Sequence, residues 1–154
     1  MSVSSRLEEL GITLPLAVAP VANYVPFRQA GSLLAIAGQV PISEGKRVFQ
    51  GVLGTGNITV EDATAAARLC ALNVLAQTAV ALDGDLDRIK ACIRLGVFVA
   101  ASAEFTEHPL IANGASDLIV EVLGEAGLHA RAAVGCSSLP LGVPVEVEAM
   151  FEIG

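Results

Sequence analysis

Two long helical patterns separated by one strong strand pattern constrain the fold of this chain most. Apolar residues recur at helical spacing over residues 59–82, where Thr59 is a suitable N-cap and two acidic residues occupy the first turn. A second helical pattern covers residues 108–127, and residues 91–101 between the two are typical of a buried strand. Because such elements bury their apolar faces in layers, we expect an α+β fold with two helices packed on one mixed β-sheet.

Further strand patterns flank the two helices. Residues 24–29 and 33–37 predict a hairpin around Ala30-Gly31-Ser32, and residues 47–52 are interpreted as another strand. The segment 129–148 reads as two apolar strands joined by a short turn, which predicts a terminal hairpin. The sheet is therefore expected to receive strands from both ends of the chain.

The length of 154 residues favours one domain. No linker, repeat or low-complexity segment divides the chain, so we expect a single domain over residues 1–154. A short helix capped by Ser4 or Ser5 is expected before Gly11, and residues 1–18 are interpreted as an N-terminal extension.

Composition limits the classes of partner. Hydrophobic residues make up 53% of the sequence and charged residues 16%, against about 25% charged residues in an ordinary soluble domain. This apolar excess predicts that other subunits cover part of the surface. The net charge of −7 argues against binding to nucleic-acid phosphates and against attraction to anionic membranes. With one Tyr and no Trp, the chain also has few aromatic side chains on which bases could stack.

The cysteines and the first residues bear on location and metal binding. Cys70, Cys92 and Cys136 lie far apart in apolar runs, without a CxxC motif or a Cys/His cluster, so neither disulfides nor a metal site is expected. The start of the chain lacks the apolar core of a signal peptide, and no run is read as a membrane span. A cytoplasmic protein is the expectation.

The most informative polar residue is Arg131, on a predicted strand of Ala, Val and Cys. An arginine there requires an anionic partner, and the sequence allows two alternatives for that partner. One is an ion pair with Glu146 or Glu148, which alternate onto one face of the last strand. The other is the carboxylate of a small organic acid, which the planar guanidinium binds bidentately. The two glutamates could also divide general acid and base work.

Several motifs agree with one known family in order and spacing. The strand end that leads to Gly38-Gln39-Val-Pro resembles the "sGQ-P" motif of the Rid/YjgF family, also called L-PSP endoribonucleases. His129-Ala-Arg131, followed by Leu139-Pro140 and then Val145-Glu-Val-Glu-Ala149, resembles the closing signature of that family. The resemblance extends over roughly residues 20–152.

This resemblance implies a chorismate-mutase-like fold and a homotrimer with a central β-barrel and clefts between subunits. It also implies cofactor-free hydrolysis of reactive 2-imino or enamine acids to 2-keto acids and ammonia. The expected partner is thus a small imino or keto acid bearing a carboxylate, with no metal. Two alternatives are a module that binds keto or amino acids without turnover and, less favoured by the charge, an endoribonuclease.

By position in the motifs, the resemblance gives roles to individual residues. Arg131 matches the arginine that holds the substrate carboxylate, and Glu146 matches the acid near the imine and the attacking water. Tyr24 matches an aromatic wall of the cleft. Taken alone, the sole tyrosine of the chain would be read as a partly buried structural residue.

Four further residues are expected to border the substrate. Gly38 and Gln39 match the loop beside the site, and Asn113 lies where a site asparagine is expected. Taken alone, Asn113 before Gly114 would be interpreted as turn chemistry. Ala133, two residues after the arginine, stands where the family often has cysteine, and this departure bears on which substrate is accepted.

Overall fold

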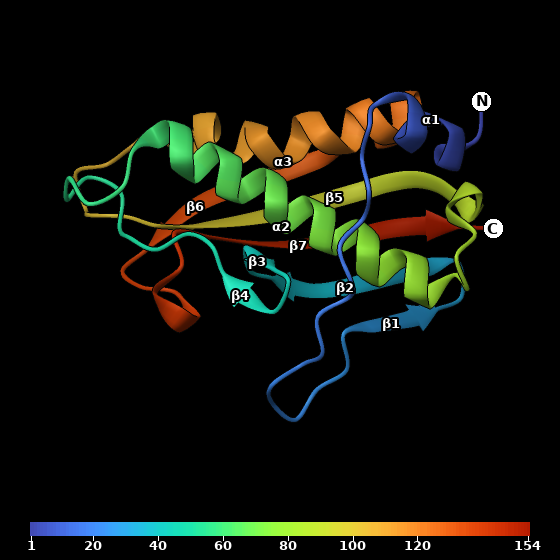
Figure 1. Cartoon of the computed structure of the whole chain (residues 1–154), viewed down its shortest axis with the longest axis horizontal. Helices are drawn as coiled ribbons and strands as arrows, with labels where there is room; N and C mark the ends of the chain where they lie inside the picture. Colours follow the sequence, from blue (N-terminus) through green and yellow to red (C-terminus); the bar gives the residue numbers. More distant parts are fainter.

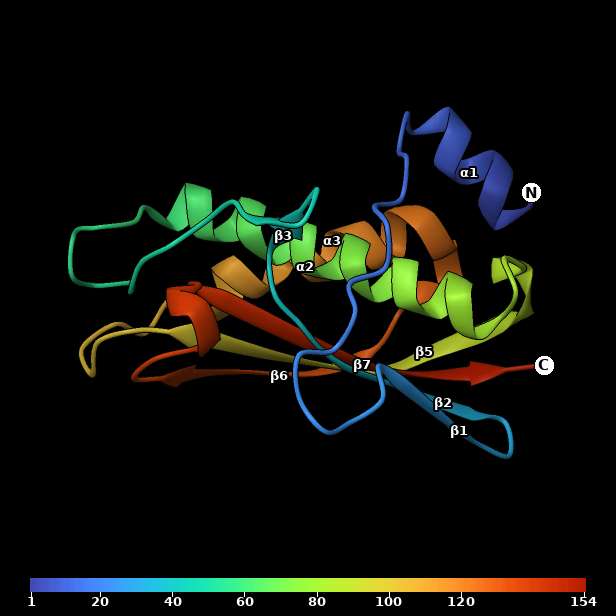
Figure 2. The same cartoon turned by 60° about the horizontal axis from the view of Figure 1, so that its bottom comes forward.

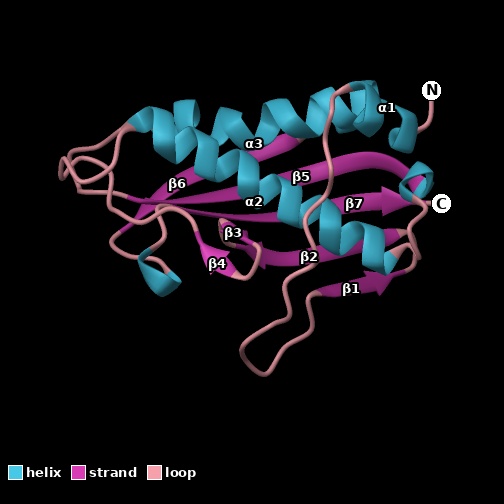
Figure 3. Cartoon of the chain, in the orientation of Figure 1, coloured by secondary structure: helices cyan, strands magenta, loops and turns pink.

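The computed structural model describes residues 1–154 as a five-stranded sheet with helices on one face (Figures 1 and 3). The elements in chain order are α1 (Val3–Glu9), β1 (Phe27–Ala30), β2 (Leu33–Gln39), β3 (Ile42–Ser43), β4 (Lys46–Arg47), α2 (Val60–Ala81), η1 (Leu86–Arg88), β5 (Ile89–Ala100), α3 (His108–Leu123), η2 (Gly124–Gly127), β6 (Ala130–Cys136), η3 (Pro140–Gly142) and β7 (Val145–Ile153). The order across the sheet is β1-β2-β7-β5-β6, with only β5 and β6 parallel. The predicted mixed sheet is confirmed.

The two long helices form a second layer over the sheet, as Figure 2 shows. The core lies between these layers, where alternate residues of β7 such as Val145, Val147 and Phe151 are fully buried. Glu146 and Glu148 point to the opposite face of the sheet, as strand alternation predicts. No helix of this chain covers that opposite face (Figure 2).

Small residues bring the two long helices close together. The Thr59 side chain accepts a hydrogen bond from the Asp62 N–H at 3.1 Å and starts α2 at the predicted place. On α3, a Cβ added at Gly114 would stand 2.1 Å from the Thr64 carbonyl oxygen of α2, so only glycine allows this approach. The second predicted helix ends at Leu123 and continues only as the 3-10 turn η2.

Helix α2 is apolar enough and long enough to cross a membrane by composition alone, with a mean hydropathy of 1.2, contrary to the expectation that no run qualifies. In the fold, 61% of that window is buried against the sheet and α3. This burial is the property of a core helix.

Two predicted elements are wrong. Residues 129–148 do not form a hairpin, because β6 pairs in parallel with β5 at the sheet edge while β7 lies between β2 and β5. Residues 47–52 do not form a strand beyond the Lys46–Arg47 pair. There Gly51 adopts φ +136°, and its N–H donates to the Gly142 carbonyl instead of to a neighbouring strand.

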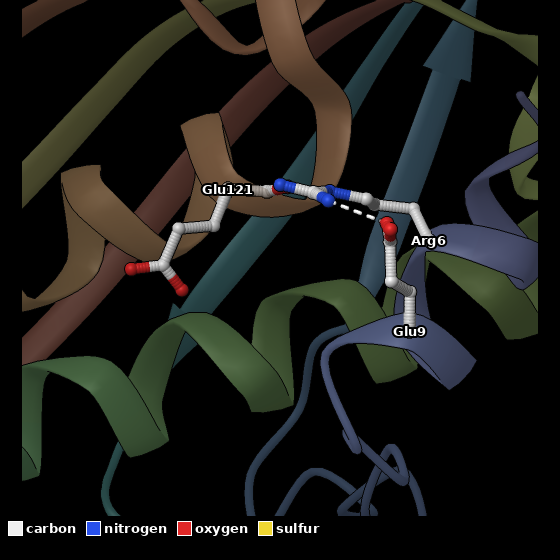
Figure 4. A network of polar contacts seen from close by, with 3 residues as sticks. All are labelled: Arg6, Glu9 and Glu121. Atoms are coloured by element: carbon white, nitrogen blue, oxygen red, sulfur yellow. Dashed lines mark hydrogen bonds and ion pairs between the residues drawn. The ribbon is translucent and has the colours of Figure 1, made fainter.

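The N-terminal segment is held against the helices. Ser2, and not Ser4 or Ser5, caps α1. The Arg6 Nε donates to the Glu121 carbonyl of α3 at 2.8 Å, and its Nη1 contacts Glu9 at 2.6 Å (Figure 4). The chain then crosses α2 on its way to β1 (Figure 1), where the Gln77 side chain donates to the Val18 carbonyl at 2.6 Å.

Candidate active site

A pocket of about 280 Å³ lies where the segment before β1 meets the end of β2. Four of the predicted site residues line it together: Tyr24, Gly38, Gln39 and Glu146. Its remaining walls are mostly apolar. They come from the segment before β1, from the residues after β2 and from the turn before β7, and are Val18, Ala19, Pro20, Val21, Ala22, Pro26, Val40, Ile42, Pro140 and Leu141.

Glu146 is the acidic group of this pocket. The backbone of Gly38 lies against its carboxyl, and Phe98 is its register partner on β5. Burial raises the pKa of Glu146, and the nearby charge of Glu148 raises it further. A carboxyl with a raised pKa holds its proton to higher pH, which suits a general acid.

Buried amides shape the loop beside Glu146. Gln39 is buried and its Nε2 donates to the Ala37 carbonyl at 3.0 Å. The fully buried Asn73 of α2 donates through Nδ2 to the carbonyls of Val40 and Ile42, both at 3.0 Å. These bonds fix the backbone at the pocket floor, while Tyr24 remains half exposed at its rim.

Arg131 lies away from this pocket, on the helix side of β6. Its Nη1 donates to Asn113 Oδ1 at 2.9 Å and to Ser116 Oγ at 3.1 Å, and its Nη2 reaches the Pro109 carbonyl at 3.5 Å. Asn113, which is expected to border the substrate, is thus a direct partner of the arginine. The alternative of an ion pair with a glutamate is not, since Glu148 pairs with Arg94 at 3.2 Å.

The remaining donors of Arg131 define what it can bind. Of five guanidinium N–H groups, Nε–H and one Nη2–H make no hydrogen bond within the chain. Arginine commonly binds the two oxygens of one carboxylate through two such N–H donors. Ala133, the next residue on the same face of β6, is half-buried and packs against the core, so it adds no polar group.

Sequence reasoning missed two neighbours of the arginine. Ser116 and His129 form a hydrogen bond of 2.9 Å, and His129 also contacts the Gly127 carbonyl at 2.6 Å. Both histidines are half-buried: a position before a proline (His108) or at a strand start (His129) predicts an exposed ring, but His129 packs beside Ser116 and His108 lies over Gly135. The spacing of the two residues could have indicated this neighbour, because His129 and Arg131 are two apart on an extended segment and therefore share a face.

The two predicted catalytic residues do not meet within one chain. Arg131 turns toward α3, whereas Glu146 lies on the face that the helices leave uncovered. The strand β5 also separates β6 from β7 in the sheet. One chain therefore presents an arginine at one edge and an acidic pocket elsewhere.

Other reactive groups contribute little. Burial raises the pKa of the Cys92 thiol to about 12 and also raises the pKa of Cys70 and Cys136, so these thiols stay protonated at neutral pH. No three His, Cys, Asp or Glu side chains gather as a set that could hold a metal ion.

The layered fold and the motif residues define a protein class. The family model "YjgF/chorismate_mutase-like, putative endoribonuclease" matches residues 4–152, so the chain belongs to the YjgF/chorismate-mutase-like family, and the resemblance seen in the sequence is confirmed. A curated relative is Protein TCP17 of Trypanosoma cruzi, 49% identical over 152 residues, which are 98% of this chain and 94% of that protein.

Two solved structures are also similar over nearly the whole chain. The protein Atu1372 with unknown function from Agrobacterium tumefaciens is 51% identical with a TM-score of 0.91, over 99% of this chain and 92% of that one. A "putative endoribonuclease" from Shewanella oneidensis MR-1 is 38% identical with a TM-score of 0.94, and the match covers 99% of this chain and 100% of that one. The fold is therefore shared across these relatives.

Proposed function

We propose that this protein is a cofactor-free hydrolase that deaminates reactive 2-imino acids to 2-keto acids and ammonia. The observation that carries the proposal is the set of contacts that Arg131 makes and leaves unmade. Its guanidinium is held by Asn113 and Ser116, meets no carboxylate of its own chain and keeps two N–H donors free, one on Nε and one on Nη2. Such a group suits the carboxylate of a small acid.

The site would form between subunits of a homotrimer. Arg131 and the Glu146 pocket lie on opposite faces of one sheet, so both can contact one small ligand only if a second copy supplies one of them. The uncovered sheet face also carries apolar side chains, with Leu33 43% and Val134 48% exposed. Burying these in a barrel of three sheets would remove apolar surface from water.

The chemistry asks little of the protein beyond positioning. Water adds to the electrophilic imine carbon to give a tetrahedral aminoalcohol. A proton then reaches the nitrogen, the C–N bond breaks with its electron pair leaving on ammonia, and the hydroxyl returns a proton to the Glu146 carboxylate as its oxygen becomes the carbonyl of the keto acid. Arg131 would hold the carboxylate, and protonated Glu146 would supply the proton to nitrogen.

The test is ammonia release from 2-iminobutanoate and 2-iminopropanoate, generated in situ by an amino-acid oxidase. We expect the wild type to accelerate release and Arg131→Ala to abolish the acceleration, with Arg131→Lys also impaired because an ammonium lacks the planar fork. Arg28→Ala, at an exposed arginine of β1, is the control. Full activity in Arg131→Ala would contradict the proposal.

A binding module without turnover is the second candidate, favoured by the inert Ala133 beside the arginine. It predicts thermal stabilisation by 2-keto acids, lost in Arg131→Ala, with no ammonia release. The endoribonuclease role in the name of the family fits less well with a net charge of −7. RNA cleavage that disappears on repurification would remove that role. A cytoplasmic location agrees with three unpaired cysteines.

A further inference from the structure

A line of polar groups runs from Arg131 to the backbone at the end of η2. It passes from the Arg131 Nη1 to the Ser116 hydroxyl, from Ser116 to the His129 Nε2, and from the His129 Nδ1 to the Gly127 carbonyl. We propose that Ser116 and His129 are positioning residues that fix the orientation of the Arg131 guanidinium. The proposal rests on the proposed function, in which Arg131 holds the substrate carboxylate.

The direction of each hydrogen bond follows from the two ends of the line. The Gly127 carbonyl can only accept, so the His129 Nδ1, 2.6 Å away, carries a hydrogen. A neutral imidazole has one N–H, which leaves Nε2 as an acceptor. The Ser116 hydroxyl, 2.9 Å away, therefore donates to Nε2.

This direction sets what Ser116 offers to the arginine. Since its single proton is on the bond to His129, the serine oxygen turns lone pairs toward Arg131 and accepts from Nη1 at 3.1 Å. Asn113 accepts from the same nitrogen at 2.9 Å. With Nη1 held by two acceptors, the free donors on Nε and Nη2 face a fixed direction.

The fold builds this line with few degrees of freedom. Asn113 and Ser116 are three apart on α3 and thus share one helix face. Gly114 seats that part of α3 tightly on α2. Gly127 allows a similarly close approach of η2 to α3, because a Cβ at Gly127 would stand 2.5 Å from the Ile119 carbonyl oxygen. The close turn brings its own carbonyl to His129.

Two pairs of variants separate positioning from mere structure. Ser116→Ala and His129→Leu break the line, whereas Ser116→Thr keeps a hydroxyl and His129→Gln keeps an acceptor. An arginine that binds the carboxylate equally in ground and transition states affects KM more than kcat. We expect KM for the imine to rise about five- to tenfold in the breaking variants, as for loss of one hydrogen-bond partner, with kcat within about twofold. The conserving variants should approach the wild type.

Asp117→Ala, at an exposed residue of the same helix, is the kinetic control. If Ser116→Ala and His129→Leu change KM no more than this control does, or if the conserving variants fail to restore it, the positioning role is overturned. Melting temperatures of all variants show whether an increase in KM is separable from a loss of stability.

A second readout does not depend on activity. In ¹⁵N NMR of the wild type, at a pH where the ring is neutral, His129 should be the Nδ1–H tautomer. The Arg131 guanidinium resonances should show slowed rotation that Ser116→Ala releases. An Nε2–H tautomer, or unchanged rotation in Ser116→Ala, would overturn the proposal. If the wild type deaminates no imine, the proposed function fails, and these spectra alone decide the positioning role.

Discussion

Gly38 and Glu146 lie directly against one another across the β2–β7 pair. A Cβ added at Gly38 would stand 2.7 Å from the Glu146 Oε1 and 2.9 Å from its Cδ. The register between the two strands shifts between Ile36 and Gln39, so a bulge places this glycine opposite the carboxyl. The missing side chain at position 38 therefore makes the space that Glu146 occupies beside the pocket.

Replacing this glycine should move the carboxyl. We expect Gly38→Ala to lower imine deamination at least about tenfold, since a small misplacement of a catalytic group can cost about a hundredfold in rate. Gly96→Ala is the matched control, because its Cβ would stand 2.6 Å from the Oε1 of Glu148. Equal loss of activity in the two variants, both with the oligomeric state of the wild type, would contradict a specific role for Glu146.

Glu146 should also make stability depend on pH. Its pKa is raised in the folded protein by burial and by Glu148, so the folded state binds the proton more tightly than the unfolded state does. Stability contributed by this proton is present at low pH and is lost as pH rises from the unfolded pKa through the raised folded value.

Glu146→Gln removes the group that titrates. Its melting temperature should exceed that of the wild type at pH 8, and the difference should narrow below about pH 4, where glutamates are protonated in both states. Glu152→Gln, at an exposed position of the same strand, is the control. A wild type that is the more stable protein at pH 8 would contradict the assigned direction of the shift.

The buried Asn73 should be required for the pocket floor. Asn73→Asp keeps the shape of the side chain, but a carboxylate cannot donate to the carbonyls of Val40 and Ile42. We expect a loss of about 2–5 kcal/mol in the free energy of unfolding, because buried acceptors and a charge are left unpaired. Urea denaturation measures it, and a loss below about 1 kcal/mol, the scale of a surface substitution, would contradict this role.

Local patterns in the sequence predicted the helices well and the strand order poorly. The start of α2 is marked by Thr59, and its packing by runs of alanine, which are local signals. The position of β7 between β2 and β5 depends on contacts with residues that lie 46 to 64 positions earlier in β5 and more than 100 positions earlier in β2, where no turn residue fixes the pairing. The local pattern of residues 129–148 therefore predicts a hairpin of two neighbouring strands, which the sheet does not contain.

The same limit applies to the candidate site. Alternation correctly placed Glu146 and Glu148 on one face, and the family motifs selected Tyr24, Gly38 and Gln39, which the fold brings together with Glu146. Alternation within each strand could not show that Arg131 faces the helices. That orientation depends on which face of the edge strand β6 the α3 helix covers.

The most direct test of a site shared between subunits mixes two inactive variants. In a cyclic trimer of Arg131→Ala and Glu146→Gln subunits, one of the three clefts takes both intact residues from different chains. Random one-to-one co-assembly, verified by native mass spectrometry, should restore about a quarter of wild-type deamination, since about three-quarters of the trimers are mixed. Activity no higher than that of either parent, in verified mixed trimers, would contradict the shared site.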